Sequence, residues 1–506
     1  MLRRRLNGVA TVRRTQRHLR WIVPAAILAL AAFLRFWALA RPGTLVFDEL
    51  YYVRDAVSQL AHGYPTTWPD DDPAFNAERA RLFSNEASSI AHPPLGKWLI
   101  GLGILLFGAD SGWGWRSAVA LFGTATVGVA MRLGFVLSRS HVVAWITGLL
   151  LAVDGVHVVL SRVSLLDGFL TFFVALGALC LVHDWRWCRR RAAPDRVLWC
   201  RPWLLASGLV FGAAAAVKWS GLYALAAFLL LLTLADLIRR WGEDRRPMLQ
   251  SIRQGVVTAM IALPAAAAAY LVSWAGWIAE PGAQDREPGV PWWVSLWRWH
   301  LDAFTWHSTL DAPHPFQSNP LTWPLGLRPT AMYDERWDGY VAAITPVPNP
   351  LVTWGGVIAL VFLLSVVVRA ILVAMRTRRL APLRARTTAV AAFVLVGYLS
   401  GWLPWVLTVS RSAVFQFYAV VLTPFAAIAL ALLLASFASP VRGKGLMRRA
   451  GISLASDASA LQGRRFAVTI FLTAALVLGL LFWPLWIGMP VDHWFYRLHL
   501  WLPGWV

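Results

Sequence analysis

Two adjacent acids, Asp48 and Glu49, directly follow the first membrane-length apolar run, in the stretch PGTLVFDELYYV. A carboxylate beside a hydroxyl group can accept its proton, and such general-base catalysis typically accelerates a reaction by about 10² to 10⁴-fold. On a helix, neighbouring side chains diverge by about 100°, so these two cannot face one another as the carboxylates of a retaining glycosidase do. The pair therefore predicts one base and a neighbour that orients the acceptor.

A structural role for Asp48 is equally compatible with the sequence. After it, Leu50, Val53 and Val57 lie on one face of a helix that is predicted to end at Gly63, half immersed in lipid headgroups. Asp48 would then be the N-cap, where a carboxylate accepts hydrogen bonds from free backbone amides. Catalysis and capping remain open alternatives.

Three cations on the predicted side of Asp48 could bind a phosphate. Lys218 interrupts the apolar run LVFGAAAAVKWSGLYALAAFLLLL, and a charge at the centre of a membrane helix costs roughly 2.5 to 3.5 kcal/mol on insertion scales. Alternatively, Lys218 belongs to a short external turn and extends its ammonium group to water. Arg116 and Arg411 are predicted at the external ends of spans, where each could instead be an interface anchor. Together the three could neutralise the charge that develops on a leaving phosphate oxygen.

Other polar residues of the predicted external side have less specific signals. His92 precedes two prolines that hold an extended turn, and it could contact a phosphate or an acceptor, or be structural. Arg162 and Asp167 are predicted to form a structural ion pair. The sequence has no HExxH motif, clustered Asp motif or glycine-rich phosphate loop, so we predict no metal and no cofactor. The lack of a nucleotide-binding domain argues against a sugar-nucleotide donor and against ATP-driven transport.

The elements that must position these side chains are membrane helices. The chain has 506 residues, 58% of them hydrophobic, with 30 Trp and a mean hydropathy of +0.56, which is typical of an all-α polytopic membrane protein with aromatic belts. A span needs about 20 mostly apolar residues, and residues 95–107 are too short, so they predict an interfacial or re-entrant segment. By this criterion we predict eleven spans: 21–40, 116–137, 141–160, 165–184, 203–220, 222–240, 255–275, 351–374, 388–408, 412–436 and 466–488.

The net charge of +21 indicates membrane orientation, not nucleic-acid binding. The basic residues gather in alternate connections, and the remaining connections are acidic on balance. The positive-inside rule then predicts a cytoplasmic N-terminus and an extracytoplasmic C-terminus. The basic connections are 3–20, 186–201, 239–253, 376–386 and 442–465.

Two external loops and no appended domain organise the chain. We predict a cytoplasmic tail (1–20), a catalytic membrane domain (21–488) with external loops at 41–115 and 276–350, and an extracytoplasmic tail (489–506). Residues 1–40 resemble a secretory signal, but the apolar part is about 20 residues long and ends in an interface-anchor pattern, which favours a retained helix. The three cysteines are predicted at or inside the cytoplasmic face and have neither a disulfide framework nor a metal-ligand spacing.

At this point the sequence resembles the protein O-mannosyltransferases, integral-membrane glycosyltransferases of the GT-C type. The matching motifs follow the family's order over nearly the whole chain, and the paired FDE and HPPL signals together with VKWSG are fairly specific. The motifs are LRFWALARPGTLVFDELYYV around Asp48, AHPPLGKWLIGLG at His92, SRVSLLDGFLTFF from Ser161, GLVFGAAAAVKWSGLY around Lys218, HPFQSNPLTWPLGLRP from His314, and an FWPLW-type ending near Trp483.

The resemblance implies transfer of mannose from polyprenyl-phosphate mannose to Ser or Thr hydroxyls of secreted or membrane proteins, outside the cytoplasm and with inversion. It makes Asp48 the general base and Glu49 an acceptor-orienting group. Arg116, Lys218 and Arg411 would hold the lipid phosphate. Residues 276–350 lack the β-trefoil insertion of eukaryotic members, which points to the shorter bacterial, actinobacterial-type branch in the plasma membrane. Its acceptor proteins could emerge from a secretion channel.

Two other functions remain as alternatives. A related lipid-dependent GT-C transferase would glycosylate a lipid or a glycan, and only the specificity of the motifs argues against it. A transporter or lipid flippase would be expected to have inverted repeats and broken helices at the membrane midplane. No repeat is visible in the sequence, and the ionisable residues are predicted to gather at one external face.

Overall fold

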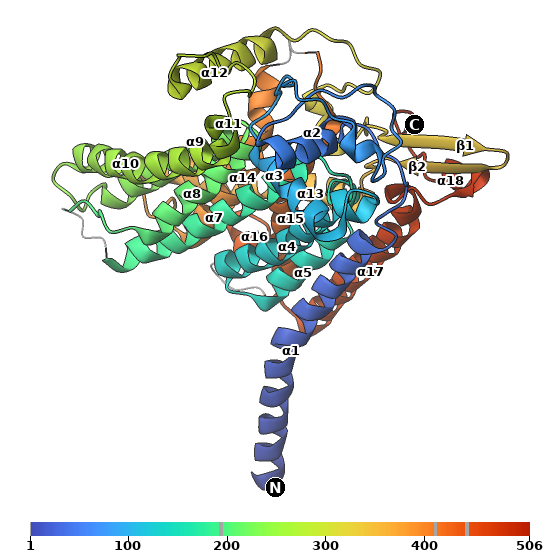
Figure 1. Cartoon of the computed structure of the whole chain (residues 1–506). Coiled ribbons are helices and arrows are strands. Elements are labelled where there is room, and N and C mark those ends of the chain that lie inside the picture. The colour runs from blue at the N-terminus through green and yellow to red at the C-terminus, as the bar shows by residue number, and fades with distance from the viewer. Residues whose placement is uncertain (1, 192–195, 409–411, 441–444, 506) are drawn as a thin grey trace.

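Helices dominate the computed structural model, which describes residues 2–191, 196–408, 412–440 and 445–505 (Figure 1). Arg411 lies outside these ranges. In chain order the elements are α1 (Leu2–Phe36), α2 (Glu49–His62), η1 (Arg79–Arg81), α3 (Leu95–Phe107), α4 (Gly112–Ser138), α5 (His141–Ala152), α6 (Gly155–Val159), α7 (Leu166–Arg191), α8 (Pro202–Val217), α9 (Gly221–Arg240), α10 (Pro247–Ser273), α11 (Ala275–Ala279), α12 (Trp292–Thr309), η2 (Pro320–Leu325), β1 (Tyr333–Trp337), β2 (Tyr340–Ile344), α13 (Pro350–Thr377), α14 (Arg386–Leu407), η3 (Gln416–Leu422), α15 (Thr423–Phe437), α16 (Leu446–Arg449), α17 (Ala458–Trp486), β3 (Val491–Asp492) and α18 (His493–Leu498).

Nine helices in the described ranges are long and apolar enough to cross a membrane. The predicted count of eleven is not confirmed, because the segments predicted as 141–160 and 203–220 contain helices of only 12 and 16 residues. The first is interrupted after α5, where Asp154 caps the separate helix α6 by accepting from the amide of His157 at 2.8 Å. The second ends where Lys218 becomes extended (φ −151°, ψ 136°). The nine are α1 from His18, α4, α7, α9, α10, α13, α14, η3 with α15, and α17.

The helix α3 has 13 residues, so it is too short to span a membrane, as predicted for residues 95–107. It packs between α2 and α4. A side chain at Gly103 would place its Cβ 2.4 Å from the carbonyl oxygen of Gly114, so glycine is required for this close approach of α3 to α4. The helix therefore holds α2, which follows Asp48, against the bundle.

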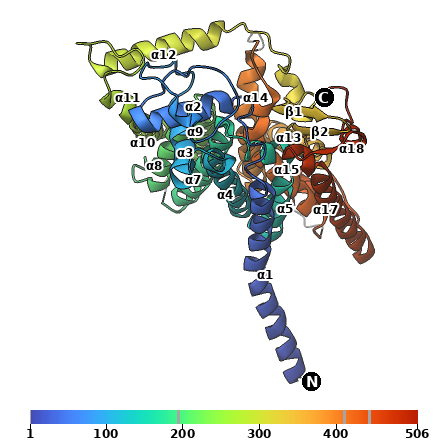
Figure 2. The same ribbon diagram turned by 45° about the vertical axis from the view of Figure 1, so that its right-hand side comes forward.

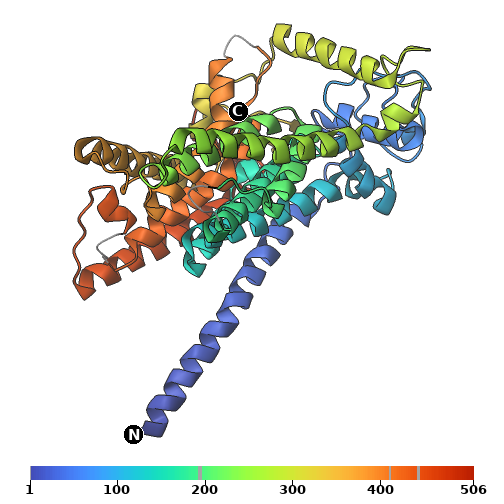
Figure 3. The ribbon, with the colours of Figure 1, turned by 90° about the vertical axis from the view of Figure 1, so that its left-hand side faces the viewer.

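The bundle has two distinct ends. The N-terminal part of α1 projects beyond one end, whereas α12 lies across the other (Figures 2 and 3). Within the bundle, α8 packs against α7 and α10, and α4 against α3, α5 and α7. The connection that carries Asp48 leaves α1 at the end of the bundle that α12 covers (Figure 1).

A small antiparallel sheet corrects the all-α prediction. Its strand order is β1-β2-β3, and β2 is buried from Val341 to Ile344 while β1 is largely exposed. Asp338 and Gly339 form the hairpin turn, and Gly339 has φ +80°. An Asp-Gly pair between short runs of strand-forming residues is a hairpin signal, so the sequence did contain this information.

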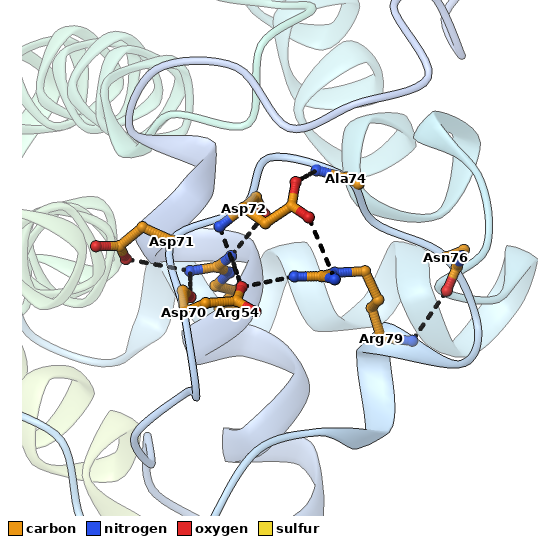
Figure 4. A network of polar contacts seen from close by, with 7 residues as sticks. All are labelled: Arg54, Asp70, Asp71, Asp72, Ala74, Asn76 and Arg79. Carbon is orange, nitrogen blue, oxygen red and sulfur yellow. Dashed lines mark hydrogen bonds and ion pairs between the residues drawn. The ribbon is translucent and has the colours of Figure 1, made fainter.

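The segment that follows α2, within the loop 41–115 that the sequence predicts to be external, is tied to α2 by Arg54 (Figure 4). Its guanidinium donates to the carbonyl oxygens of Asp70 and Asp72, both at 2.7 Å. Arg79 then pairs with Asp70 at 2.6 Å and with Asp72 at 3.2 Å. Because Arg54 is 6% exposed and Asp71 is 92% exposed, the buried arginine and not the surface acid organises this loop.

Candidate active site

Asp48 stands at the N-terminus of α2 without serving as a side-chain cap. Its backbone is helical (φ −67°, ψ −4°) and its carboxylate makes no capping hydrogen bond. Only its backbone carbonyl contributes, accepting from the amides of Tyr51 and Tyr52 at 3.1 and 3.0 Å. The preceding Phe47 has φ +50°, an unusual conformation for a residue with a Cβ, and such conformations cluster at functional sites. The capping interpretation of the carboxylate is therefore wrong.

The environment of Asp48 makes its carboxylate unusually basic. Burial raises the pKa of Asp48 to about 6, the positive charge of Lys218 opposes this rise, and the negative charge of Asp167 adds to it. Tyr52 is 8% exposed, and burial together with the Asp48 charge raises the pKa of its phenol well above the usual value. A carboxylate with such a pKa is ionised near neutral pH and accepts a proton more readily than an ordinary aspartate.

Glu49 has the opposite environment. Its side chain is fully buried and accepts four hydrogen bonds: two from Arg116, at 2.8 and 2.7 Å, and one each from the amides of Val46 and Ser164, at 3.0 and 2.9 Å. Arg116 also donates to three backbone carbonyls between α1 and α2, those of Leu39, Pro42 and Thr44. The structure thus brings two predicted site residues together as a buried ion pair that fixes the backbone around Asp48.

Lys218 is buried and paired, and it does not extend to water. Its ammonium group lies 3.0 and 2.8 Å from the two carboxylate oxygens of Asp167, and the lysine is 7% exposed. On another side it lies 4.3 Å from the centre of the Tyr418 ring. Since Lys218 and Asp167 both act on the charge of Asp48, the three groups form one electrostatic unit.

The predicted ion pair between Arg162 and Asp167 is wrong. Arg162 instead donates to four backbone carbonyls at the C-terminal end of α1, between Leu34 and Ala38, at 2.7 to 3.3 Å. The last carbonyls of a helix have no partner within it, and a buried arginine with several donors satisfies them. Asp167 is thereby left for Lys218, a pairing that cannot be distinguished from the predicted one by sequence alone.

His92 lies where α12 meets the segment between α2 and α3. Its ring stacks on that of His307 at 5.4 Å between centroids and is 6.2 Å from the ring of Tyr52. His307 donates from Nε2 to the carbonyl oxygen of Ala91 at 2.9 Å. The residues of α12 therefore cover the turn that carries His92.

A second polar contact holds α12 beside Lys218. Trp219 donates through its indole nitrogen to the hydroxyl of Tyr270 at 3.1 Å, and that hydroxyl bonds to Nε2 of His300 at 2.7 Å. The Trp219 ring also stacks on His300. Sequence reasoning missed the pairing of Asp167 with Lys218, the contact with Tyr418 and this aromatic contact, because each joins segments far apart in the chain.

The described part of the chain offers no group of three or more His, Cys, Asp or Glu side chains that could hold a metal ion. The reactive groups at the site are instead the half-buried carboxylate of Asp48, the Lys218–Asp167 pair and His92, which stacks on His307 of α12. Such an arrangement can remove a proton from a hydroxyl and stabilise a leaving anion.

Comparisons with known proteins agree with the resemblance. Residues 25–279 match the family model for dolichyl-phosphate-mannose-protein mannosyltransferase, and residues 292–505 match that for the C-terminal four transmembrane region of protein O-mannosyltransferase. The chain is 32% identical to a polyprenol-phosphate-mannose–protein mannosyltransferase of Mycobacterium tuberculosis, over 96% of this chain and 92% of that protein. A relative with the same description from Corynebacterium glutamicum is 28% identical over 96% and 93% of the two chains.

The fold agrees as well. A protein O-mannosyltransferase complex of Saccharomyces cerevisiae, solved with the sugar donor bound, superposes with a TM-score of 0.74 at 15% identity, covering 96% of this chain and 92% of that one. The likeness supports a GT-C fold for this chain. The chain is a member of the dolichyl-phosphate-mannose-protein mannosyltransferase family, and it is a membrane glycosyltransferase of the polyprenyl-phosphate-mannose–protein mannosyltransferase type.

Proposed function

We propose that this enzyme transfers mannose from polyprenyl-phosphate mannose to Ser or Thr hydroxyls of secreted or membrane proteins, at the extracytoplasmic face of the plasma membrane. The observation that carries the mechanistic part is the half-buried, uncapped carboxylate of Asp48, whose pKa is raised to about 6. Donor and acceptor classes are supported by the descriptions of the relatives. Membership of this family also favours a transferase over the transporter or flippase alternative.

The proposed reaction is a single displacement with inversion. The acceptor hydroxyl oxygen attacks the anomeric carbon of mannose while its proton passes to a carboxylate oxygen of Asp48. The bond between that carbon and the phosphate oxygen breaks, and polyprenyl phosphate departs with the bonding electrons. Phosphate is a good leaving group, so the step requires no general acid, and positioning of the two substrates supplies much of the acceleration.

Lys218 is the proposed cation for the departing phosphate. Within the described ranges its ammonium group pairs with Asp167, and its positive charge lowers the pKa of Asp48, which supports this assignment. Arg411 stays a proposed phosphate ligand through the family resemblance. Arg116 is already neutralised by Glu49, so we expect it to support donor binding through the position of the loop.

His92 and Glu49 are proposed to act on the acceptor side. Stacking on His307 holds the imidazole of His92 at the edge of α12, where an extended acceptor segment over the first loop would pass. The carboxylate of Glu49 already accepts four hydrogen bonds from other groups of the protein. Its effect on the acceptor would therefore come from fixing the backbone next to Asp48.

The decisive experiment uses purified full-length enzyme in detergent with polyprenyl-phosphate mannose and a Ser/Thr/Pro-rich peptide. We expect the mass of the peptide to rise by one hexose, and NMR of the product to show inverted configuration. A glycan and a lipid acceptor are offered in parallel reactions. Transfer to either of these, with none to the peptide, would instead support the related lipid-dependent transferase.

A further inference from the structure

A cavity of about 340 Å³ lies at the end of the bundle opposite Asp48, where α4, α5, α14, α15 and α16 meet. Its distance from the catalytic region follows from α4. Arg116 in the first turns of α4 bonds to Glu49, whereas Arg139 follows the last turn, about 35 Å away at 1.5 Å per residue. The cavity is therefore separate from the proposed donor and acceptor sites.

Arginines without acidic partners surround this cavity. Arg386 and Arg448 line it, and Arg139 and Arg186 are close enough to Arg386 and to one another for their charges to repel. Within the described ranges none of these four makes an ion pair. Arg186 and Arg386 are half-buried, whereas Arg139 and Arg448 are exposed. Like charges held together at half-buried positions are unfavourable unless an anion compensates them.

Capping of α4 accounts for only part of this charge. Arg386 donates to the carbonyl oxygen of Leu137 at 2.7 Å, and Arg186 donates to that of Val136, which satisfies the free end of the helix. The C-terminal end of a helix carries only about half a negative charge, whereas Arg139, Arg186 and Arg386 bring three positive charges. A surplus of positive charge remains beside the cavity.

The lining of the cavity fits a lipid. No Asp or Glu side chain is among its lining residues, and its walls include the apolar side chains of Val143, Val390 and Leu432. The hydroxyl of Thr387, also in the lining, is buried and has no hydrogen-bond partner in the described part of the chain. Next to it, α14 begins without a side-chain cap, so its first amides can donate to an anion.

We propose that this cavity binds the phosphodiester headgroup of an anionic phospholipid, with Arg386 and Arg448 on the phosphate and an acyl chain along the apolar wall. A lipid is favoured over a soluble phosphate because α4, α14 and η3–α15 are candidate membrane spans, so their ends lie at headgroup depth. Basic pockets between spans are a known way of holding such headgroups.

Native mass spectrometry of the delipidated full chain, titrated with dioleoylphosphatidylglycerol, tests this site. At low salt we expect one saturable site, with an affinity about fivefold lower for Arg448→Gln and about 30-fold lower for the double variant with Arg386→Gln, following the usual contribution of each arginine near a lipid surface. Arg386 also bonds to the end of α4, so its replacement could disturb the fold. The single Arg448→Gln variant avoids this risk, and each variant should have the same thermal unfolding midpoint as the wild type. Ser436→Trp, which fills the cavity without changing charge, should also abolish binding.

The matched control is the double variant Arg376→Gln/Arg379→Gln, which removes two exposed arginines from the same end of the bundle, outside the cavity. It should bind the lipid like the wild type. The proposal is overturned if this control weakens binding as much as the cavity variants do, if phosphatidylcholine binds equally well, or if inorganic phosphate displaces the lipid at comparable concentrations.

Discussion

Two neighbouring carboxylates of this enzyme have different surroundings, which is why we propose different roles for them. Asp48 has no capping bond and a raised pKa, whereas Glu49 is fully buried and bonded to Arg116. Conservative amide substitutions therefore separate chemistry from stability at two adjacent positions.

Replacing Asp48 with Asn should lower transfer at least about 100-fold, because the amide cannot accept the hydroxyl proton. Since the folded protein raises the pKa of Asp48, its ionised form opposes folding near neutral pH, and the variant should melt no lower than the wild type. Hexose transfer to peptide and thermal unfolding in detergent measure the two effects. Asp110→Asn, an exposed acid of the same loop, is the matched control. Near-normal turnover by the Asp48 variant would remove this residue from the mechanism.

The rate should also follow the ionisation of Asp48. With a pKa of about 6, the base is ionised at neutral pH, so the rate should be level there and should fall tenfold per pH unit below that value. Initial rates from about pH 5 to about pH 8 provide the profile, and unfolding midpoints over the same range exclude denaturation as its cause. A rate that stays constant down to the acid end would contradict Asp48 as the base.

Replacing Glu49 with Gln should mainly destabilise the fold. It leaves the guanidinium of Arg116 buried without its counter-charge, and breaking a buried pair in this way typically costs about 3 to 5 kcal/mol. We expect a clear drop in the thermal midpoint, in contrast to Asp48→Asn. An unchanged midpoint with lost transfer would assign Glu49 to the chemistry itself.

The sequence indicated candidate site residues but not their partners in space. The unusual types and positions of Asp48, Glu49 and Lys218 identified them, because charges beside apolar spans need a reason. Their pairings depend on which loops meet in space, so Arg162 was assigned to the acid that Lys218 holds.

At the level of elements, the buried arginine of α2 is the main link between that helix and the first external loop (Figure 4). Arg54→Ala removes two short bonds to backbone carbonyls and should destabilise the loop by about 1.5 to 3 kcal/mol per charged bond. Faster cleavage by trypsin next to Arg79 and Arg81 should reveal this destabilisation of the loop. Asp71→Ala removes only a long, exposed ion pair and should have little effect. Equal cleavage of both variants would contradict this role of Arg54.

The helices were predicted well where the length of an apolar run determines where they begin and end. They were predicted less well where a local polar contact determines this. The long spans and the short α3 follow from hydropathy alone. The break between α5 and α6 depends on one capping contact of Asp154, and the small sheet on strands whose third member comes from the C-terminal segment. Neither feature can be predicted from the hydropathy of a single segment.

At the scale of the whole molecule, charge and fold together predict which end faces the cytoplasm. The described parts of the basic connections lie at the end opposite Asp48, where Arg384 and Arg386 bond to the ends of α9 and α4. The positive-inside rule predicts that this end faces the cytoplasm. The exposed native Cys200 belongs to one of those connections, whereas Asp110 follows α3 on the other side, next to the start of α4.

A membrane-impermeant maleimide should therefore label Asp110→Cys in intact cells, while Arg379→Cys and the native Cys200 should react only after lysis. Both substitutions are made in a Cys188→Ser/Cys200→Ser background, and the wild type reports on Cys200 itself. The proposed donor and acceptors must both reach Asp48 from outside the cytoplasm. If Arg379→Cys is labelled in intact cells while Asp110→Cys is protected, the orientation of the chain is the opposite of the predicted one. That result would place the base in the cytoplasm and rule out extracytoplasmic transfer.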